Sequence, residues 1–279
     1  MSNFNYLIPT IYDAPDGYDV TVAVGPDHIA RRLAGRTGQV AWDVRVFHDG
    51  QVVDDRRTVL SFKPDRLPAE SEIISVWQGT KFDGKQRPAF IESCFSIMDG
   101  ASSFATKSPV ANYALYAAPN RPSYRADGAY KFGSPPTIST VSSLGRLIDG
   151  HPIVRLDRTQ GFGESVACIN PYGRPINVAV RTHDGRELPR YRVAPLAGAL
   201  ISLEPLLKEG EGRWAGRMQI IANNRVLLFH LRHKFGDPRD ITDHEHLDPY
   251  RADPTHLPTT LWLRQFIGRI AANRFGMKR

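Results

Sequence analysis

The sequence predicts a mostly β protein with two antiparallel β-sandwich-like domains and a C-terminal amphipathic helix. Within Gly163–Leu207, apolar and polar residues alternate between short turn clusters, the pattern of successive half-buried strands. The same alternation begins at Val40 and is closed by Asp49 and Gly50, a dipeptide typical of hairpin turns. Over Thr259–Phe275, apolar residues instead recur at helical spacing.

The first domain is expected over residues 19–150, after an N-terminal arm formed by residues 1–18. Its clearest strand places Val40, Trp42, Val44 and Val46 on one face, because side chains alternate along an extended chain. The predicted strands are Asp19–Gly25, Val40–Val46, Val52–Phe62, Ile73–Trp77, Ala89–Met98 and Asn112–Ala118.

The second domain is expected over residues 151–235. Asp184 and Gly185 mark the tight turn of a hairpin, since glycine accepts the positive φ that such turns require. The predicted strands are Pro152–Leu156, Val166–Ile169, Ile176–Arg181, Leu188–Val193, Leu200–Leu203, Met218–Ala222 and Val226–Leu231. Residues 236–258 are polar and rich in turn formers, so they are predicted to form a loop after the sandwich.

The strand pattern of Glu164–His233, about a quarter of the chain, resembles that of the sensory rhodopsin transducer proteins. The resemblance is carried by Glu-Ser-Val, an asparagine with a polar turn, an alternating strand, Asp-Gly, an arginine-rich return strand and a final apolar strand. It implies a bacterial cytoplasmic β-sandwich that binds a partner and is not a catalyst.

Composition excludes several other classes of protein. With 279 residues and ordinary hydrophobic content, the chain can bury a core without disulfides, and its two cysteines are too few for a secreted disulfide framework. The N-terminus lacks a basic region followed by an apolar run, so a cytoplasmic location is expected. Five of the seven net positive charges fall in residues 259–279, and this distribution does not indicate a basic face for nucleic acid.

A long segment inside the first domain, residues 119–140, combines prolines and glycines with basic and aromatic side chains. Long irregular loops are often functional, and arginine with tyrosine suits an anionic or sugar ligand. The alternative is a proline-stiffened connection whose tyrosines pack on the sheet. The candidate ligand-binding residues are Arg121, Tyr124, Arg125, Tyr130 and Lys131.

The nearest approach to a nucleophile motif runs from Gly163 through Ser165 to Ala167. A nucleophile elbow needs a strand before the serine and a helix after it, whereas here a strand is expected to follow. The motif therefore does not predict a catalytic serine, and no catalytic residue is assigned.

One segment has metal-ligand spacing: His244, His246 and Asp248 would share one side of an extended chain. The alternative, a hydrogen-bonded polar surface loop, is favoured because the neighbouring carboxylates would keep these histidines protonated. His230 and His233 have odd spacing, which places them on opposite faces of a strand. No cofactor or metal is therefore expected.

The C-terminal helix, within residues 259–279, is predicted to dock onto another surface. Its own sandwich, a second subunit, a protein partner or an anionic membrane could each cover the apolar face, and its basic residues suit a membrane surface. The candidate docking residues are Trp262, Leu263, Phe266, Ile267, Ile270, Arg264, Arg269 and Arg274.

Together these patterns favour a non-catalytic binding or scaffold protein that engages a protein partner, another copy of itself or a membrane surface. The alternative is a metal-dependent or sugar-active enzyme that uses the 121–131 loop with His244, His246 and Asp248.

Overall fold

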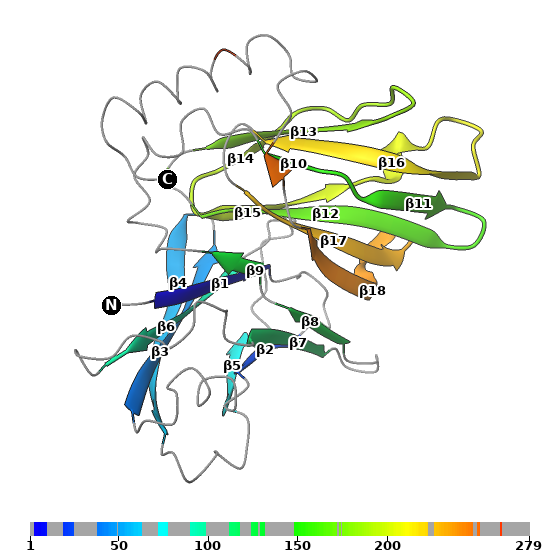
Figure 1. The fold of residues 1–279 in the computed structure, drawn as a ribbon. Helices are drawn as coiled ribbons and strands as arrows, with labels where there is room; N and C mark the ends of the chain where they lie inside the picture. The colour runs from blue at the N-terminus through cyan, green and yellow to red at the C-terminus, as the bar shows by residue number, and fades with distance from the viewer. Residues whose placement is uncertain are drawn as a thin grey trace. The chain divides into compact units, whose positions relative to one another are not determined.

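The protein is mostly β, and every pairing between its described strands is antiparallel, as the sequence predicts (Figure 1). The chain divides into two compact units, Met1–Ser134 and Pro135–Arg279. The computed structural model describes residues 3–9, 19–24, 38–48, 50–62, 72–77, 90–98, 112–117, 124–127, 129–131, 148–171, 173, 175–222, 226–247, 250–251 and 263.

The first unit contains two sheets. One consists of β1 (Asn3–Pro9), β3 (Gly38–His48), β4 (Gln51–Phe62), β6 (Phe90–Ile97) and β9 (Ala129–Lys131), in the order β4-β3-β6-β1-β9. The other consists of β2 (Asp19–Val24), β5 (Glu72–Trp77), β7 (Asn112–Ala117) and β8 (Tyr124–Asp127), in the order β5-β2-β7-β8.

Buried polar contacts connect β3 to β6. The Trp42 indole N–H donates to the Ser93 hydroxyl oxygen at 2.7 Å, and both side chains are fully buried. Beside them, the buried Glu92 carboxylate forms an ion pair with Arg45. A buried carboxylate that lost such a partner would be strongly destabilising, so these contacts favour the observed register of the two strands.

The second unit is built around a ten-stranded sheet. Its strands are β10 (Ile148–Gly150), β11 (Ile153–Asp157), β12 (Phe162–Asn170), β13 (Ile176–Thr182), β14 (Tyr191–Val193), β15 (Ala197–Ser202), β16 (Arg213–Ala222), β17 (Leu227–Lys234), β18 (Asp237–Leu247) and β19 (Tyr250–Arg251). A short 3₁₀ helix, η2 (Glu204–Leu206), follows β15.

Two groups of strands make up this sheet. β16 pairs with β13 on one edge and with β10 and then β11 on the other, while β12 lies between β15 and β17, with β18 beyond β17 (Figure 1). The only pairing between β11 and β12 is Asp157 with Phe162, at the hairpin that joins the groups.

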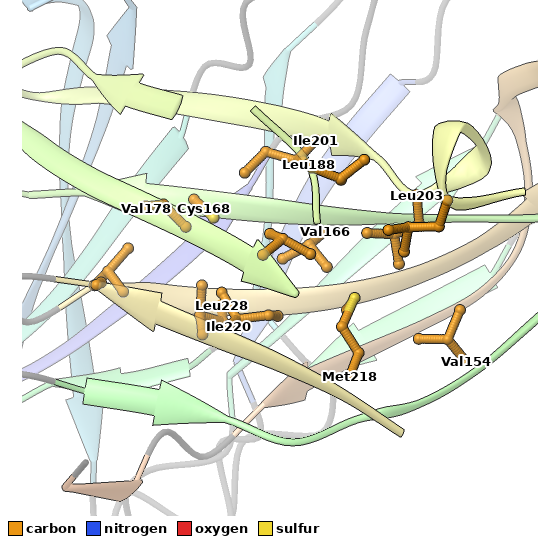
Figure 2. Packing of buried hydrophobic residues seen from close by; sticks show 14 of the residues in the cluster. Val154, Val166, Cys168, Val178, Leu188, Ile201, Leu203, Met218, Ile220 and Leu228 are labelled. Atoms are coloured by element: carbon orange, nitrogen blue, oxygen red, sulfur yellow. The ribbon is translucent and has the colours of Figure 1, made fainter. Parts of the chain in front are cut away.

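Apolar side chains from both groups meet in one core (Figure 2). Val178 of β13 and Ile220 of β16 come from the first group, and Val166 and Cys168 of β12 come from the second. The alternation predicted for β13 is observed, because Ile176, Val178 and Val180 are buried while Asn177 is exposed. Alternation thus directs one face of each strand into the core.

Each unit carries one cysteine, and both are free thiols. Burial, with a smaller contribution from the Glu92 charge, raises the pKa of Cys94 to about 11. Burial raises the pKa of Cys168 to about 12. Both thiols are therefore protonated near neutral pH; Cys168 is buried and Cys94 is partly exposed.

A polar network closes the β13 hairpin at Gly185, whose φ is 87°. Arg186 contacts the carboxylates of Asp184 and Glu211 and stacks 5.2 Å from the Trp214 ring centroid. The Trp214 indole N–H donates to Asp184 at 3.1 Å. Hydrogen bonds from Thr182, Arg186 and Trp214 lower the pKa of Asp184 to about 2.

The structure corrects the predicted loop over residues 236–258. β18 occupies Asp237–Leu247 and pairs with β17 after a turn at Gly236, whose φ is 79°. Sequence alternation is weak here because the pairing is irregular, with register shifts at Arg232–Lys234. An edge strand can also carry proline and exposed charged residues that would disrupt a central strand.

Three further predictions change. β10, placed in the first domain by the sequence, pairs with β16 of the second unit and continues the register of β11 along the same edge. The predicted 119–140 loop contains β8 and β9, because its tyrosines favour extended structure. The predicted arm of residues 1–18 contains β1, which pairs with β6 and β9.

The predicted C-terminal helix, Thr259–Phe275, lies outside the described residues except for Leu263. That residue has helical backbone and a half-exposed side chain. Within the described part of the chain, there is no helix long and apolar enough to span a bilayer.

Matched substitutions test the core assignment. Ile220 is fully buried, whereas Ile153 is 75% exposed. Ile220→Ala should lower the free energy of unfolding by about 2–5 kcal/mol, since it leaves a cavity. Ile153→Ala should change it by less than about 0.5 kcal/mol. Urea denaturation measures both, and equal losses would contradict the core described above.

The Asp184 network predicts a specific acid sensitivity. The pKa of Asp184 is lower in the folded protein than in the unfolded chain, where it is about 3.9. Its ionised form therefore stabilises the fold above about pH 4, and this stabilisation is lost as the pH falls towards about 2. Asp184→Asn should lower the melting temperature at pH 6 and have a much smaller effect near pH 2, measured by thermal unfolding across this range.

Asp243→Asn is the control for this experiment, because Asp243 forms only a loose ion pair at the surface. Its side chain is 58% exposed and lies 3.7 Å from the Arg232 guanidinium. A melting-temperature difference for Asp184→Asn that did not depend on pH would rule out the electrostatic explanation.

Candidate functional site

Several chemically reactive side chains of the second unit meet where β12 pairs with β17. Glu164 and Ser165 are consecutive on β12, so their side chains lie on opposite faces of the sheet. His230 and His233 on β17 are likewise on opposite faces, as their odd spacing predicts. Each histidine therefore meets a different β12 side chain.

Ser165 and His233 form the pair that most resembles a catalytic site. The Ser165 hydroxyl oxygen lies 2.7 Å from His233 Nε2, and His233 Nδ1 lies 2.9 Å from the Lys234 carbonyl oxygen. A carbonyl only accepts hydrogen bonds, so Nδ1–H is the donor and Nε2 accepts from the serine hydroxyl. The Glu204 carboxylate is 3.9 Å from Nδ1, which completes the residue types of a Ser-His-acid triad.

Burial separates this arrangement from a working nucleophile. Ser165 is fully buried, and His233 is 2% exposed. Ser165 also lies within a nine-residue strand that pairs on both edges, where no sharp turn presents its hydroxyl. The hydroxyl serves as a hydrogen-bond donor inside the sheet, and the strand that the sequence predicts after Ser165 is observed.

Glu164 and His230 form the second pair, on the other face of β12. The Glu164 carboxylate lies 2.7 Å from His230 Nε2 and 3.4 Å from Arg232 Nε. The glutamate side chain is 3% exposed. A buried carboxylate requires such partners, so this cluster satisfies the polar requirements of the strand pair.

Glu204 links η2 to the turn between β17 and β18. Its carboxylate accepts a hydrogen bond from the Gly236 backbone N–H at 2.7 Å. A Cβ at Gly163 would lie 2.5 Å from this carboxylate and 2.7 Å from the His233 ring, closer than carbon atoms pack. The glycine of the serine-like motif is therefore required for close packing.

Two of the candidate metal ligands, His244 and His246, lie on β18 and not in a loop. His244 is buried on β18, with its ring 5.1 Å from the Phe229 ring in an edge-on arrangement. His246 is two residues further along β18, opposite Phe229. Asp248 lies outside the described residues. Among the residues that the structure describes, no three histidine, cysteine or acidic side chains cluster as a metal site would require.

The candidate ligand-binding residues fall on two different sheets. Tyr124 and Arg125 lie on β8, opposite Tyr116 and Leu115 of β7. Tyr130 and Lys131 lie on β9, opposite residues of β1. Arg121 is outside the described residues. The structure therefore does not place these residues in one continuous loop.

The candidate docking residues also fall outside the described part of the chain, apart from Leu263. The residues outside it are Trp262, Phe266, Ile267, Ile270, Arg264, Arg269 and Arg274. Leu263 is 50% exposed.

A surface that the sequence analysis did not identify lies on β11 and its neighbours. We call it the β11 edge patch, and it consists of Ile153, Arg155, Phe162, Arg213 and Arg217. All five residues are exposed, with Ile153 at 75% and Phe162 at 47%. The alternation of β11 contains this signal, since Val154 and Leu156 are buried while Ile153 and Arg155 face outward.

Ser165→Ala tests the structural role of the serine. The substitution leaves buried His233 Nε2 without its donor, which should cost about 1–3 kcal/mol of unfolding free energy. Ser61→Ala, at an exposed position on β4, should have little effect. The folded protein should not react with a fluorophosphonate, detected by mass spectrometry. Stoichiometric labelling of Ser165 would instead identify an accessible nucleophile.

Comparisons with known proteins do not assign a family. No protein-family model and no curated protein matches the chain. Similar solved structures include the apo form of a lectin from Pleurotus ostreatus, with 8% identity over 94% of this chain and 80% of that chain, at a TM-score of 0.19. A glycosyl hydrolase family 2 member from Bacteroides cellulosilyticus has 10% identity over 90% of this chain and 27% of that chain, at a TM-score of 0.17.

A β-glucuronidase from Bacteroides uniformis has 9% identity over 90% of this chain and 26% of that chain, at a TM-score of 0.19. The chain thus spans about a quarter of the length of each of the two bacterial enzymes. TM-scores of this size carry no argument about fold or activity, so the function is argued from the chain's own residues.

Proposed function

We propose that this chain is a non-catalytic, cytoplasmic binding or scaffold protein built on β-sandwich domains. It engages a protein partner, a second copy of itself or a membrane surface, and it has no resident cofactor. The observation that best supports this proposal is that the most reactive residues form contacts inside the fold. Ser165, His233 and Glu204 have the residue types of a triad, yet Ser165 and His233 are buried in the sheet and bonded to each other, and Glu204 on η2 accepts a hydrogen bond from the Gly236 backbone N–H.

A β-sandwich is the architecture that best explains the second unit. Side chains from β13 and β16 share one buried cluster with side chains from β12 and β17. Two layers that face one core satisfy the apolar faces of both, which is the physical basis of sandwich folds.

The exposed surface of the second unit favours binding. Arginine and large apolar side chains together in an exposed patch are typical of interaction sites, because both are enriched among residues that contribute most to binding. The β11 edge patch combines three arginines with Ile153 and Phe162.

The predicted C-terminal helix supplies the second element of the proposal. If Trp262, Leu263, Phe266, Ile267 and Ile270 were exposed together, their apolar area would be unfavourable by several kcal/mol. A helix of this kind would therefore need a cover. Five basic residues without an acidic one favour a cover outside the protein's own core, such as an acidic partner or an anionic membrane.

Phe266→Glu tests this docking role, and Gln265→Glu is the matched control because it introduces the same charge at a neighbouring position outside the apolar face. We expect Phe266→Glu to leave the melting temperature unchanged while it alters oligomer size or abolishes binding to anionic vesicles. Thermal unfolding, light scattering and vesicle co-sedimentation measure these properties.

Two outcomes would contradict the docking role. A fall of several degrees in melting temperature with unchanged assembly would show that the helix packs on its own domain. No change in stability, assembly or lipid binding would leave the helix without a docking role.

A further inference from the structure

The β11 edge patch has the geometry of one continuous surface. β11 and β16 are antiparallel, and Ile153 is directly opposite Arg217 while Arg155 is opposite Ala215. Directly opposed side chains lie on the same face, roughly 5 Å apart at Cβ, and diagonal neighbours are roughly 7–8 Å apart. Arg155 and Arg217 are therefore diagonal neighbours on the solvent side of the sheet.

Phe162 extends this surface around the β11–β12 hairpin. The guanidinium carbon of Arg155 lies 4.9 Å from the centroid of the Phe162 ring, within the range of a cation–π contact. The Arg155 side chain also bonds to Gln160 at 2.5 Å. These contacts hold the guanidinium in place, so less conformational entropy is lost when it binds a ligand.

The charge of the patch is positive and largely uncompensated. No described carboxylate forms an ion pair with Arg213 or Arg217. Asp157 lies directly opposite Arg213 in the register. One Asp157 carboxylate oxygen accepts hydrogen bonds from Thr159 and Gln160 in the hairpin turn, and the other is 3.5 Å from Arg155. Asp157 thus offsets part of the charge of Arg155 but leaves the two β16 arginines available.

One edge of β11 is open among the described strands. β16 occupies the other edge over Ile153–Asp157, but β12 pairs with β11 only at Asp157. From Ser165 onwards, β12 pairs with β15. An unpaired strand edge presents N–H and C=O groups that an extended peptide can pair with.

We propose that the β11 edge patch binds an extended acidic segment of a partner protein, which adds as a strand at β11. Alternate side chains of such a strand are offset by two residues along the strand direction, which is also the offset of Arg155 from Arg217, although Arg217 lies one strand further from the added strand. Carboxylates at alternate positions can therefore each meet one guanidinium, in the bidentate geometry that arginine favours. The apolar side chains between them face the other side of the added strand, the side on which Val154 and Leu156 of β11 lie, while the carbon chains of the acidic side chains can contact Ile153.

This inference rests on the proposed binding function and names the chemistry of one partner. The open strand edge and the 75% exposed Ile153 favour a peptide over a nucleic acid or a membrane. The phosphate backbone of a nucleic acid does not form strand-like hydrogen bonds with an unpaired strand edge, and it gains little from contact with an exposed isoleucine. Main-chain pairing with side-chain contacts at alternate positions is instead the usual mode of strand addition.

The experiment uses the full-length protein and a fluorescent peptide of alternating glutamate and valine. Fluorescence anisotropy at low salt should show saturable binding, which weakens as salt screens the charges. A matched peptide of alternating lysine and valine should not bind. Arg155→Glu combined with Arg217→Glu should weaken binding of the acidic peptide by at least about ten-fold, because each change places a carboxylate of the protein against a carboxylate of the peptide.

The control variant reverses the same number of charges elsewhere. Arg56→Glu combined with Arg57→Glu alters two exposed arginines on β4, whose side chains are 48% and 58% exposed. It should leave affinity within about two-fold of wild type, since these arginines belong to the first unit and the patch to the second. Circular dichroism checks the folding of each variant. If the glutamate variant fails to fold, Arg155→Gln with Arg217→Gln replaces it, with the same direction of effect expected.

Three results would overturn the proposal. The acidic peptide could fail to bind the folded wild-type protein, or both double variants could lose affinity equally, which would indicate non-specific attraction. Tighter binding of oligothymidylate or phosphatidylserine vesicles through Arg155 and Arg217 would assign the patch to a different polyanion. Failure of this inference alone would leave the docking role of the C-terminal helix intact, because the Phe266→Glu experiment tests it separately.

Discussion

The second unit depends on the pairing of β16 along both of its edges. Residues 218–222 pair with β13 on one side, and β10 and β11 follow one another in a single register on the other. A shift of one residue would exchange the buried and exposed faces of the strand. Met218 and Ile220 would then leave the core, and Arg217 would enter it. Register at β16 thus determines both the core and the charged surface.

Buried polar pairs add specificity to this apolar framework. On β12, Glu164 and Ser165 each have one histidine partner on β17, at 2.7 Å in both cases. Pairing β12 and β17 in any other register would leave a carboxylate, a hydroxyl and two imidazoles buried without partners, at a cost of several kcal/mol. Carboxylate, hydroxyl and imidazole groups are common in catalytic sites. In this protein they select one alignment of β12 and β17.

Local patterns made part of the fold predictable. The alternation of β13, the Asp-Gly turn at Gly185 and the early hairpin around β3 are local signals, and the structure confirms each of them. β18 could not be predicted in this way, because it depends on a partner strand across a bulged register. The strands at Tyr124 and Tyr130 were likewise obscured by flanking prolines and glycines.

The candidate site was harder to predict, because its contacts join distant parts of the sequence. Ser165 and His233 are 68 residues apart, and Glu164 and His230 are 66 apart. The sequence did place the two histidines on opposite strand faces, but it contained no signal for their partners. The role of Gly163 was also hidden, since the clash that a side chain would cause involves Glu204 and His233. The outward arginines of β11 and β16 became a patch only through strand pairing.

The distribution of the two thiols has a consequence for studying how this protein opens. Cys94 belongs to the first unit and Cys168 to the second, and both are protonated at neutral pH because burial raises the pKa of each thiol. Each thiol becomes more reactive when local or global unfolding exposes it fully to solvent, where its pKa returns to about 8.5. The chain therefore carries one natural reporter of opening in each unit. Alkylation rates at the two positions would separate the breathing of the first unit from that of the second, without any added label.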